Sequence, residues 1–184
     1  MSRNYKFHNP EAPYFISFAV VDWQDVFTRN QYKQILLDSL SYSQKEKGME
    51  IYAWYIMTNH VHLIFRSTTA YPPQNLIGDF KRFTSRKIIE AIEENPRESR
   101  KEVLLSCFKK NAERSSNCSN HQFWRHDNKP IQLWSNKVIY QKIKYIHMNP
   151  VVEGYVFRPE DYSYSSALDY SGTKGLLDGV VVCR

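Results

Sequence analysis

The chain has 184 residues, 42% hydrophobic and 15% aromatic, which is enough to bury one core and excludes global disorder. Its 25 Lys and Arg against 19 Asp and Glu give a net charge of +6 and a pI near 9.1, which favours an anionic partner without identifying it. The N-terminal apolar run is short and no stretch reaches the length of a membrane span, so we expect a cytoplasmic protein with no membrane partner. The three cysteines are scattered, which predicts reduced thiols and neither a disulfide framework nor a CxxC-type zinc site.

The first half of the chain alternates strand-like and helix-like patterns. Runs rich in β-branched and aromatic residues predict strands over Tyr14–Val21, Glu50–Met57 and His60–Arg66. The spacing of apolar residues predicts helices over Gln31–Lys45, closed by Gly48, and over Gln74–Glu93. Thr58-Asn59 between the second and third strands suggests the turn of an antiparallel hairpin.

The second half gives a less regular pattern. We expect a short helix over Arg97–Ala112, a polar loop over 113–122, short strands at Phe123–Arg125 and Ile131–Trp134, and a helix from Ser135-Asn136 through Met148, ended by Pro150. The element order predicts an α+β fold with a mainly antiparallel sheet, helices packed on one face, and a ferredoxin-like split βαβ arrangement. We expect one domain over residues 1–184, with residues 151–184 as a tail that the patterns do not assign.

The third strand contains a His-x-His pair. In a strand, His60 and His62 project from the same face about 6.7 Å apart, while Val61 and Leu63 project into the core. Two imidazoles on one rigid strand can share a metal ion. Chance also produces such pairs, and two ordinary surface histidines are the simpler interpretation, so a third ligand and a reactive group are needed.

The final predicted helix offers both. Tyr145 and Asn149 are i and i+4, on the flank of the apolar stripe, and Lys142 at i−3 joins the same flank. The Asn149 amide oxygen suits a cation such as Mg²⁺ or Mn²⁺. Any one of 13 tyrosines is ordinarily a packing residue, so this spacing alone does not assign a nucleophile.

Basic residues on the second helix face away from its apolar stripe. Lys81, Arg82 and Arg86 are candidates for contacts to a nucleic-acid backbone, and Lys142 is a further candidate. The alternative is a solvated helix face.

Two segments resemble a known family. TNHVHLIF at 58–65 resembles the His-hydrophobe-His (HUH) strand of single-tyrosine HUH transposases, and YIHMNPVVEGYV at 145–156, followed by RPEDYSYSSALDY, resembles the branch associated with repetitive extragenic palindromes (REP). The resemblance implies a fold of the HUH-endonuclease type, a Tyr145 nucleophile, and a divalent metal, Mg²⁺ or Mn²⁺, held by His60, His62 and Asn149. Segment 95–122 does not align with the family pattern, and His147 occupies a position at which that pattern varies.

The activity that the resemblance implies is cleavage and transfer of single-stranded DNA through a 5′-phosphotyrosine, on hairpin-flanked, REP-like DNA. The partner would be single-stranded or hairpin DNA, and the protein would be associated with the nucleoid when it is bound to DNA. Whether the protein forms a homodimer is left open. Three alternatives also stay open: a nickase of replication-initiator or relaxase type, a non-catalytic nucleic-acid-binding α+β module, and a zinc-stabilised structural domain.

Overall fold

The computed structural model describes residues 7–115, 120–126 and 128–183. The strands are β1 (Tyr14–Ala19), β2 (Met49–Ile56), β3 (His60–Ser67) and β4 (Ile131–Gln132). The helices are α1 (Asn30–Lys47), α2 (Pro73–Glu94), α3 (Lys101–Glu113), α4 (Asn136–Val152) and α5 (Ala167–Tyr170), with 3-10 turns at Val21–Trp23, Val26–Thr28 and Pro159–Asp161.

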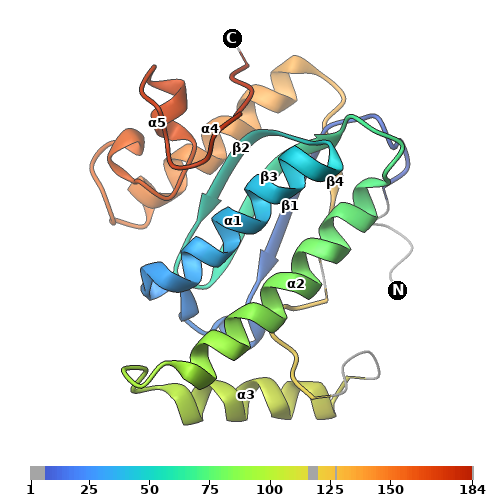
Figure 1. Cartoon of the computed structure of the whole chain (residues 1–184). Coiled ribbons are helices and arrows are strands. Elements are labelled where there is room, and N and C mark those ends of the chain that lie inside the picture. Colours follow the sequence, from blue (N-terminus) through green and yellow to red (C-terminus); the bar gives the residue numbers. More distant parts are fainter. Residues whose placement is uncertain (1–6, 116–119, 127, 184) are drawn as a thin grey trace.

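A four-stranded antiparallel sheet forms the centre of the molecule, in the order β2-β3-β1-β4 (Figure 1). The β2–β3 hairpin follows β1 and α1 in the chain. Its second strand, β3, pairs with β1, so β3 lies between β1 and β2 in the sheet. This is the split βαβ order expected from the sequence, and the α+β class is confirmed. Within the described residues, no helix combines the length and the apolar character that crossing a membrane requires.

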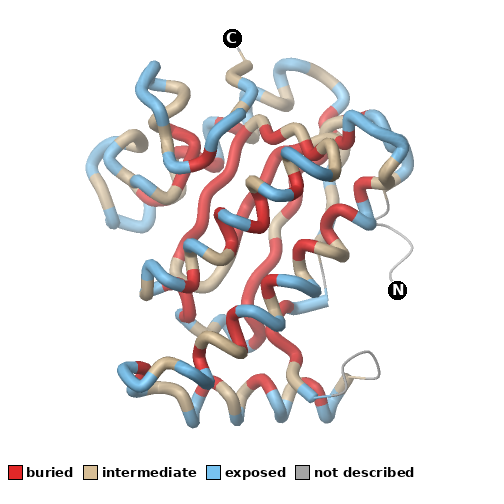
Figure 2. The backbone as a smooth tube through the Cα atoms, viewed as in Figure 1, coloured by how far each residue is buried: buried red, intermediate tan, exposed pale blue. Residues whose placement is uncertain are grey.

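Helices cover both faces of this sheet. α1 and α2 lie side by side on one face (Figure 1), and the buried backbone of the sheet runs beneath them (Figure 2). The core on this side contains Val61, Leu63 and Phe65 of β3. α4 packs on the opposite face and buries Ile143 and Ile146 against Phe15 of β1 and strand residues of β2 and β3. The expectation of helices on one face therefore holds for α1 and α2 only, because the strands present apolar side chains on both faces and each face needs a cover.

Local signals fix most element ends. Gly48 ends α1 in the left-handed conformation, with φ of 69°, and the Ser135 hydroxyl accepts a hydrogen bond from the Val138 amide at the start of α4. Pro150 does not end α4, which continues to Val152 before Gly154 turns the chain with φ of 78°.

The segment between α2 and α4 and the C-terminal tail are only partly as expected. The predicted helix over Arg97–Ala112 is α3, the predicted strand over Phe123–Arg125 is a single bridge from Trp124 to Val20, and β4 has two residues. The tail follows the outer edge of β2 through bridges from Ser165 to Tyr55 and from Val180 to Ile51. Cys107 and Cys183 are free thiols, while Cys118 and part of the predicted polar loop lie outside the described residues.

Candidate active site

His60 and His62 lie on the face of β3 that α4 covers, with ring centroids 5.2 Å apart. Burial lowers the pKa of His60 to about 4 and that of His62 to about 3, with the neighbouring His60 and Lys142 contributing further to the His62 shift. Both imidazoles are therefore neutral at pH 7. A neutral imidazole has a lone pair that can bind a metal.

The turn residue Asn59 sets the tautomer of His60. The Asn59 Nδ2 atom donates to the Asp25 carboxylate at 2.9 Å, and a carboxylate can only accept, so Oδ1 is the amide atom that faces His60. The His60 Nδ1 atom lies 2.8 Å from that oxygen and must carry the hydrogen. The lone pair of the neutral ring is consequently on Nε2.

The His60 Nε2 atom meets the Tyr55 hydroxyl at 2.5 Å. Burial raises the pKa of the Tyr55 phenol, so this hydroxyl is protonated at neutral pH and donates to the ring nitrogen. The two ends of the chain Asp25–Asn59–His60–Tyr55 thus assign the same tautomer independently. A metal on Nε2 would have to replace the Tyr55 hydroxyl.

His62 is held between two aromatic rings. It stacks on Phe15 at 5.1 Å and on Tyr55 at 5.0 Å between ring centroids, and it is 6% exposed. Its Nδ1 atom is buried, and no atom among the described residues meets hydrogen-bond geometry with it, although the Ile16 carbonyl is close enough to favour the protonated ring. A buried ring nitrogen without a well-formed hydrogen bond is uncommon in proteins.

α4 brings Tyr145 beside His62. The Tyr145 ring packs edge-on against His62, with centroids 5.5 Å apart, and against Phe15 at 6.0 Å, while 47% of the residue stays exposed. The Lys142 ammonium lies 5.4 Å from the centre of the Tyr145 ring and 4.7 Å from that of Phe15. A phenol, an ammonium and two neutral imidazoles therefore meet in one place.

Asn149 lies one turn further along α4. Its Nδ2 atom donates to the Tyr145 carbonyl at 2.6 Å, which leaves the amide oxygen as the group available to a ligand. No group of three or more His, Cys, Asp or Glu side chains in the described residues could hold a metal, so an ion at His60 and His62 would need a donor of another kind, for which the sequence pattern indicates the Asn149 amide. Two neutral imidazoles and one amide fit a divalent cation, and three neutral donors leave its charge available to an anionic phosphodiester.

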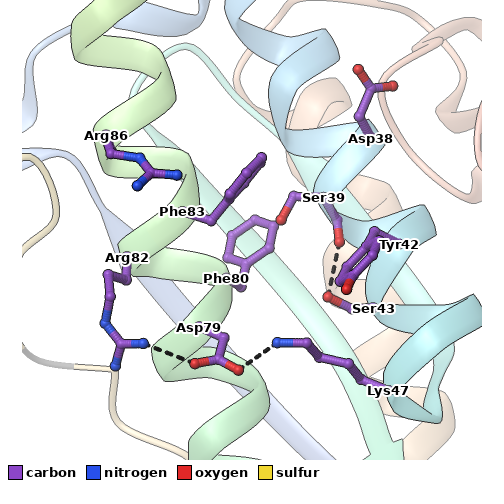
Figure 3. A pocket seen from close by; sticks show the side chains of 10 residues that line it. All are labelled: Asp38, Ser39, Tyr42, Ser43, Lys47, Asp79, Phe80, Arg82, Phe83 and Arg86. Atoms are coloured by element: carbon purple, nitrogen blue, oxygen red, sulfur yellow. Dashed lines mark hydrogen bonds and ion pairs between the residues drawn. The ribbon is translucent and has the colours of Figure 1, made fainter.

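The cations of α2 are not part of this cluster. Arg82 and Arg86 line a groove between α1 and α2, on the other side of the sheet, together with Phe83 (Figure 3). Arg82 pairs with Asp79 at 3.0 Å, and Arg86 lies 3.8 Å from Glu90. Lys81 donates to the Arg125 carbonyl at 2.6 Å and to Asn128 at 2.7 Å, so it anchors the segment that precedes β4. Of the four predicted DNA contacts, only Lys142 lies at the histidine pair.

Three neighbours of the site were missed from the sequence: Tyr55, Phe15 and Asn59. The predicted two-residue turn at Thr58-Asn59 does imply a register that sets Tyr55 opposite His62, which is the register observed. Phe15 reaches His62 across the β1–β3 pairing, for which the sequence held no signal. His147, which the family-like motif also contains, is buried against Ser166 and Tyr170 and is a packing residue.

One solved structure shares this fold over the whole chain. The REP-associated tyrosine transposase, solved bound to a REP hairpin, superposes with a TM-score of 0.64 at 16% identity, over 100% of this chain and 94% of its own. A candidate transposase from Deinococcus radiodurans R1 is 17% identical over 79% of this chain and 95% of its own, with a TM-score of 0.45. No sequence among the curated proteins matches the chain.

The family model described as "Transposase IS200 like" matches residues 14–107. The matched segment runs from β1 into α3 and includes His60 and His62, whereas Tyr145 and Asn149 lie beyond it. Because this match spans just over half of the chain, the protein belongs to the IS200-like transposase family.

Proposed function

We propose that this transposase is a metal-dependent endonuclease and strand transferase for single-stranded DNA, with Tyr145 as its nucleophile. The observation that carries the proposal is the contact between the exposed Tyr145 ring and the buried, neutral His62 ring, 5.5 Å apart, with the Lys142 ammonium 5.4 Å from the same phenol ring. A tyrosine that served only packing would not require an ammonium and a buried, neutral imidazole beside its ring.

The reaction exchanges one phosphoester for another. The Tyr145 oxygen attacks the scissile phosphorus, an O–P bond forms to the tyrosine, and the P–O3′ bond breaks. The phenol proton passes to solvent and the released 3′ oxygen takes up a proton, which leaves a 5′-phosphotyrosine and a free 3′-hydroxyl. In strand transfer, a 3′-hydroxyl attacks the phosphotyrosine and the tyrosine oxygen leaves, so no external energy source is needed.

The surrounding side chains have separable roles. The Lys142 ammonium lies close enough to offset the negative charge that the phenol and the phosphate bring together. His60, His62 and Asn149 would hold a divalent ion, Mg²⁺ or Mn²⁺, which when bound polarises a phosphoryl oxygen and stabilises charge in the transition state. The Asp25–Asn59 pair keeps His60 in the tautomer that this role needs.

The proposed substrate is a single strand flanked by a REP-like hairpin. The similar solved transposase is bound to a REP hairpin, and a single strand leaves the scissile phosphate accessible in a way that a stacked duplex does not. Lys142 would contact DNA at the cleaved phosphate. Arg82 and Arg86, on the opposite side of the sheet, would meet the hairpin stem rather than the cleaved strand, while Lys81 would act mainly through the segment it anchors.

The decisive experiment incubates the protein and Mn²⁺ with an end-labelled hairpin oligonucleotide that carries single-stranded extensions. Wild-type protein should give a covalent adduct that survives denaturing electrophoresis, and peptide mapping should find the nucleotide on Tyr145. Tyr145→Phe, which removes one oxygen and keeps the ring, should bind the same DNA and form no adduct. An adduct on another tyrosine would refute the assignment, and reversible binding alone would indicate a non-catalytic DNA-binding module.

A metal-site variant completes the experiment. The double variant His60→Ala, His62→Ala should form no adduct and bind no Mn²⁺ in calorimetry. If the double variant does not fold, His62→Phe replaces it, because phenylalanine keeps a ring in the buried position; it should show the same two losses. Adduct formation equal to wild type by these variants, or by wild-type protein in excess chelator, would refute the metal assignment.

A further inference from the structure

Trp23 is a large apolar side chain that stands half exposed beside the histidine pair. The residue is 54% exposed, and its ring centroid lies 5.9 Å from that of His60, in an edge-on arrangement. A tryptophan that served only the core would be covered, as Trp54 and Trp124 are. The mechanism above gives Trp23 no role.

The backbone that presents this ring is strained. Asp22 and Trp23 both adopt left-handed conformations, with φ of 49° and 53°, which residues other than glycine seldom adopt and which cluster at functional sites. Helix α3 fixes the first of them, because the Asp22 carboxylate accepts from Asn111 Nδ2 at 2.8 Å and from the Cys107 thiol at 3.4 Å. The structure therefore holds this exposed ring in place at the expense of two unfavourable backbone conformations.

Asn59 connects the Trp23 turn to the candidate metal ligand. Its Nδ2 atom lies 3.4 Å from the Trp23 carbonyl, and its Oδ1 atom accepts from His60. One amide thus fixes the His60 ring and the tryptophan turn relative to each other. The indole is consequently held beside His60, one of the ligands proposed for the metal.

A cation accompanies the indole. The Arg125 guanidinium carbon lies over the Trp23 ring, 5.4 Å from its centre, and Arg125 is exposed. Its backbone is fixed on both sides, since the Arg125 amide donates to the Ala19 carbonyl at 2.9 Å and Lys81 donates to the Arg125 carbonyl at 2.6 Å. An exposed indole with a guanidinium over its ring combines an aromatic surface for a nucleobase with a cation for the neighbouring phosphate.

We propose that Trp23 and Arg125 form a stacking subsite for the nucleobase that flanks the scissile phosphate. The proposal rests on the proposed function, because that function places the scissile phosphate at His60 and Tyr145. The subsite would hold the base of the nucleotide next to that phosphate. The base stacks on the indole, and the Arg125 guanidinium pairs with the neighbouring phosphate. The subsite tolerates different bases, because every base has a face that can stack.

The test measures binding of a REP-type hairpin whose single-stranded extension carries one abasic residue, moved one position at a time. In wild-type protein, an abasic residue at one position next to the cleaved phosphate should weaken binding about 5- to 150-fold, the range that base stacking supports. Trp23→Ala should weaken binding of the intact strand by a similar factor and remove the additional effect of the abasic residue. Trp23→Phe, which keeps an aromatic face, should restore most of the affinity.

Trp134→Ala provides the matched control. Trp134 is also exposed, at 77%, but follows β4 near Pro13, at the end of β1 opposite to the Ala19–His60 pair. Its loss should leave the abasic profile unchanged. Equal sensitivity of wild-type and Trp23→Ala protein to every abasic position would refute the subsite. If wild-type protein forms no adduct but its binding profile still depends on Trp23, the proposed catalysis is refuted, and Trp23 remains a base-stacking site of a DNA-binding protein.

Discussion

Replacing Tyr55 by Phe should strengthen metal binding, although it removes a hydrogen bond from the candidate site. The Tyr55 hydroxyl donates to His60 Nε2 at 2.5 Å, and the Asn59 contact leaves Nε2 as the nitrogen with the lone pair. Metal and hydroxyl therefore compete for one atom. A ligand that must first displace an internal hydrogen bond binds more weakly by the free energy of that bond.

The magnitude follows from the hydrogen bond. A buried hydrogen bond of this kind contributes about 0.5–1.5 kcal/mol net, so Tyr55→Phe should bind Mn²⁺ about 2- to 13-fold more tightly. The metal-free variant should lose about the same 0.5–1.5 kcal/mol in its free energy of unfolding, because the bond stabilises only the metal-free protein. The two changes are linked and should be close in size.

The assay is Mn²⁺ titration calorimetry at pH 7, where both imidazoles are neutral, combined with urea unfolding of the metal-free protein. Tyr162→Phe is the matched control, because the Tyr162 hydroxyl donates to the Ile56 carbonyl at 2.8 Å and does not contact His60. It should lose stability and keep wild-type Mn²⁺ affinity. Unchanged or weaker Mn²⁺ binding by Tyr55→Phe would refute the competition between metal and hydroxyl. If none of the proteins bound Mn²⁺, the metal site itself would be refuted.

Two further predictions concern the α2 cations and acid stability. Arg82→Ala with Arg86→Ala should weaken hairpin binding and make its dependence on salt shallower by up to about two charge contacts, while binding of a single strand without a stem stays unchanged; an unaltered salt slope would mean a merely solvated face. Burial lowers the pKa of His147 to about 4, below the value of about 6.5 expected in the unfolded chain, so the unfolded state binds the additional proton and native stability falls as pH drops from about 6.5 towards 4. Titration of His147 should therefore account for about 2 kcal/mol of the stability that the protein loses between pH 7 and pH 5. In His147→Gln, whose amide can still reach Ser166, the free energy of unfolding in urea should fall by about that much less over the same pH change. Equal losses in the two proteins would show that His147 titrates normally.

The sequence predicted those parts of the fold that depend on local patterns. Alternation along β3 separated His60 and His62 from Val61 and Leu63, and apolar spacing located α1, α2 and α4 within a few residues. Pro150 was expected to end α4, but a proline removes only one helical hydrogen bond, and the helix continues for a partial turn beyond it.

The contacts across the sheet could not be predicted in the same way. Which face α4 covers depends on the total apolar area of the assembled sheet, and no single segment encodes it. The same holds for Phe15 beside His62 and for Arg82 and Arg86, whose outward direction on α2 was visible but whose distance from the histidines was not. Trp23 gave no signal at all, because it lies in a turn with two left-handed residues, outside any periodic element.

Strand β3 places chemistry and packing on alternate residues of one short segment. His60 and His62 face α4, while Val61 and Leu63 are fully buried against the helices on the other side. Substitutions at the two sets are consequently under separate constraints, so the reactive positions can diverge without a change in the core beneath α1 and α2. An inserted or deleted residue has no such freedom, because a shift of one position would turn both histidines towards α1 and α2 and both apolar side chains towards α4. The hairpin length at Thr58-Asn59 is therefore expected to evolve far more slowly than the identity of the residues around it.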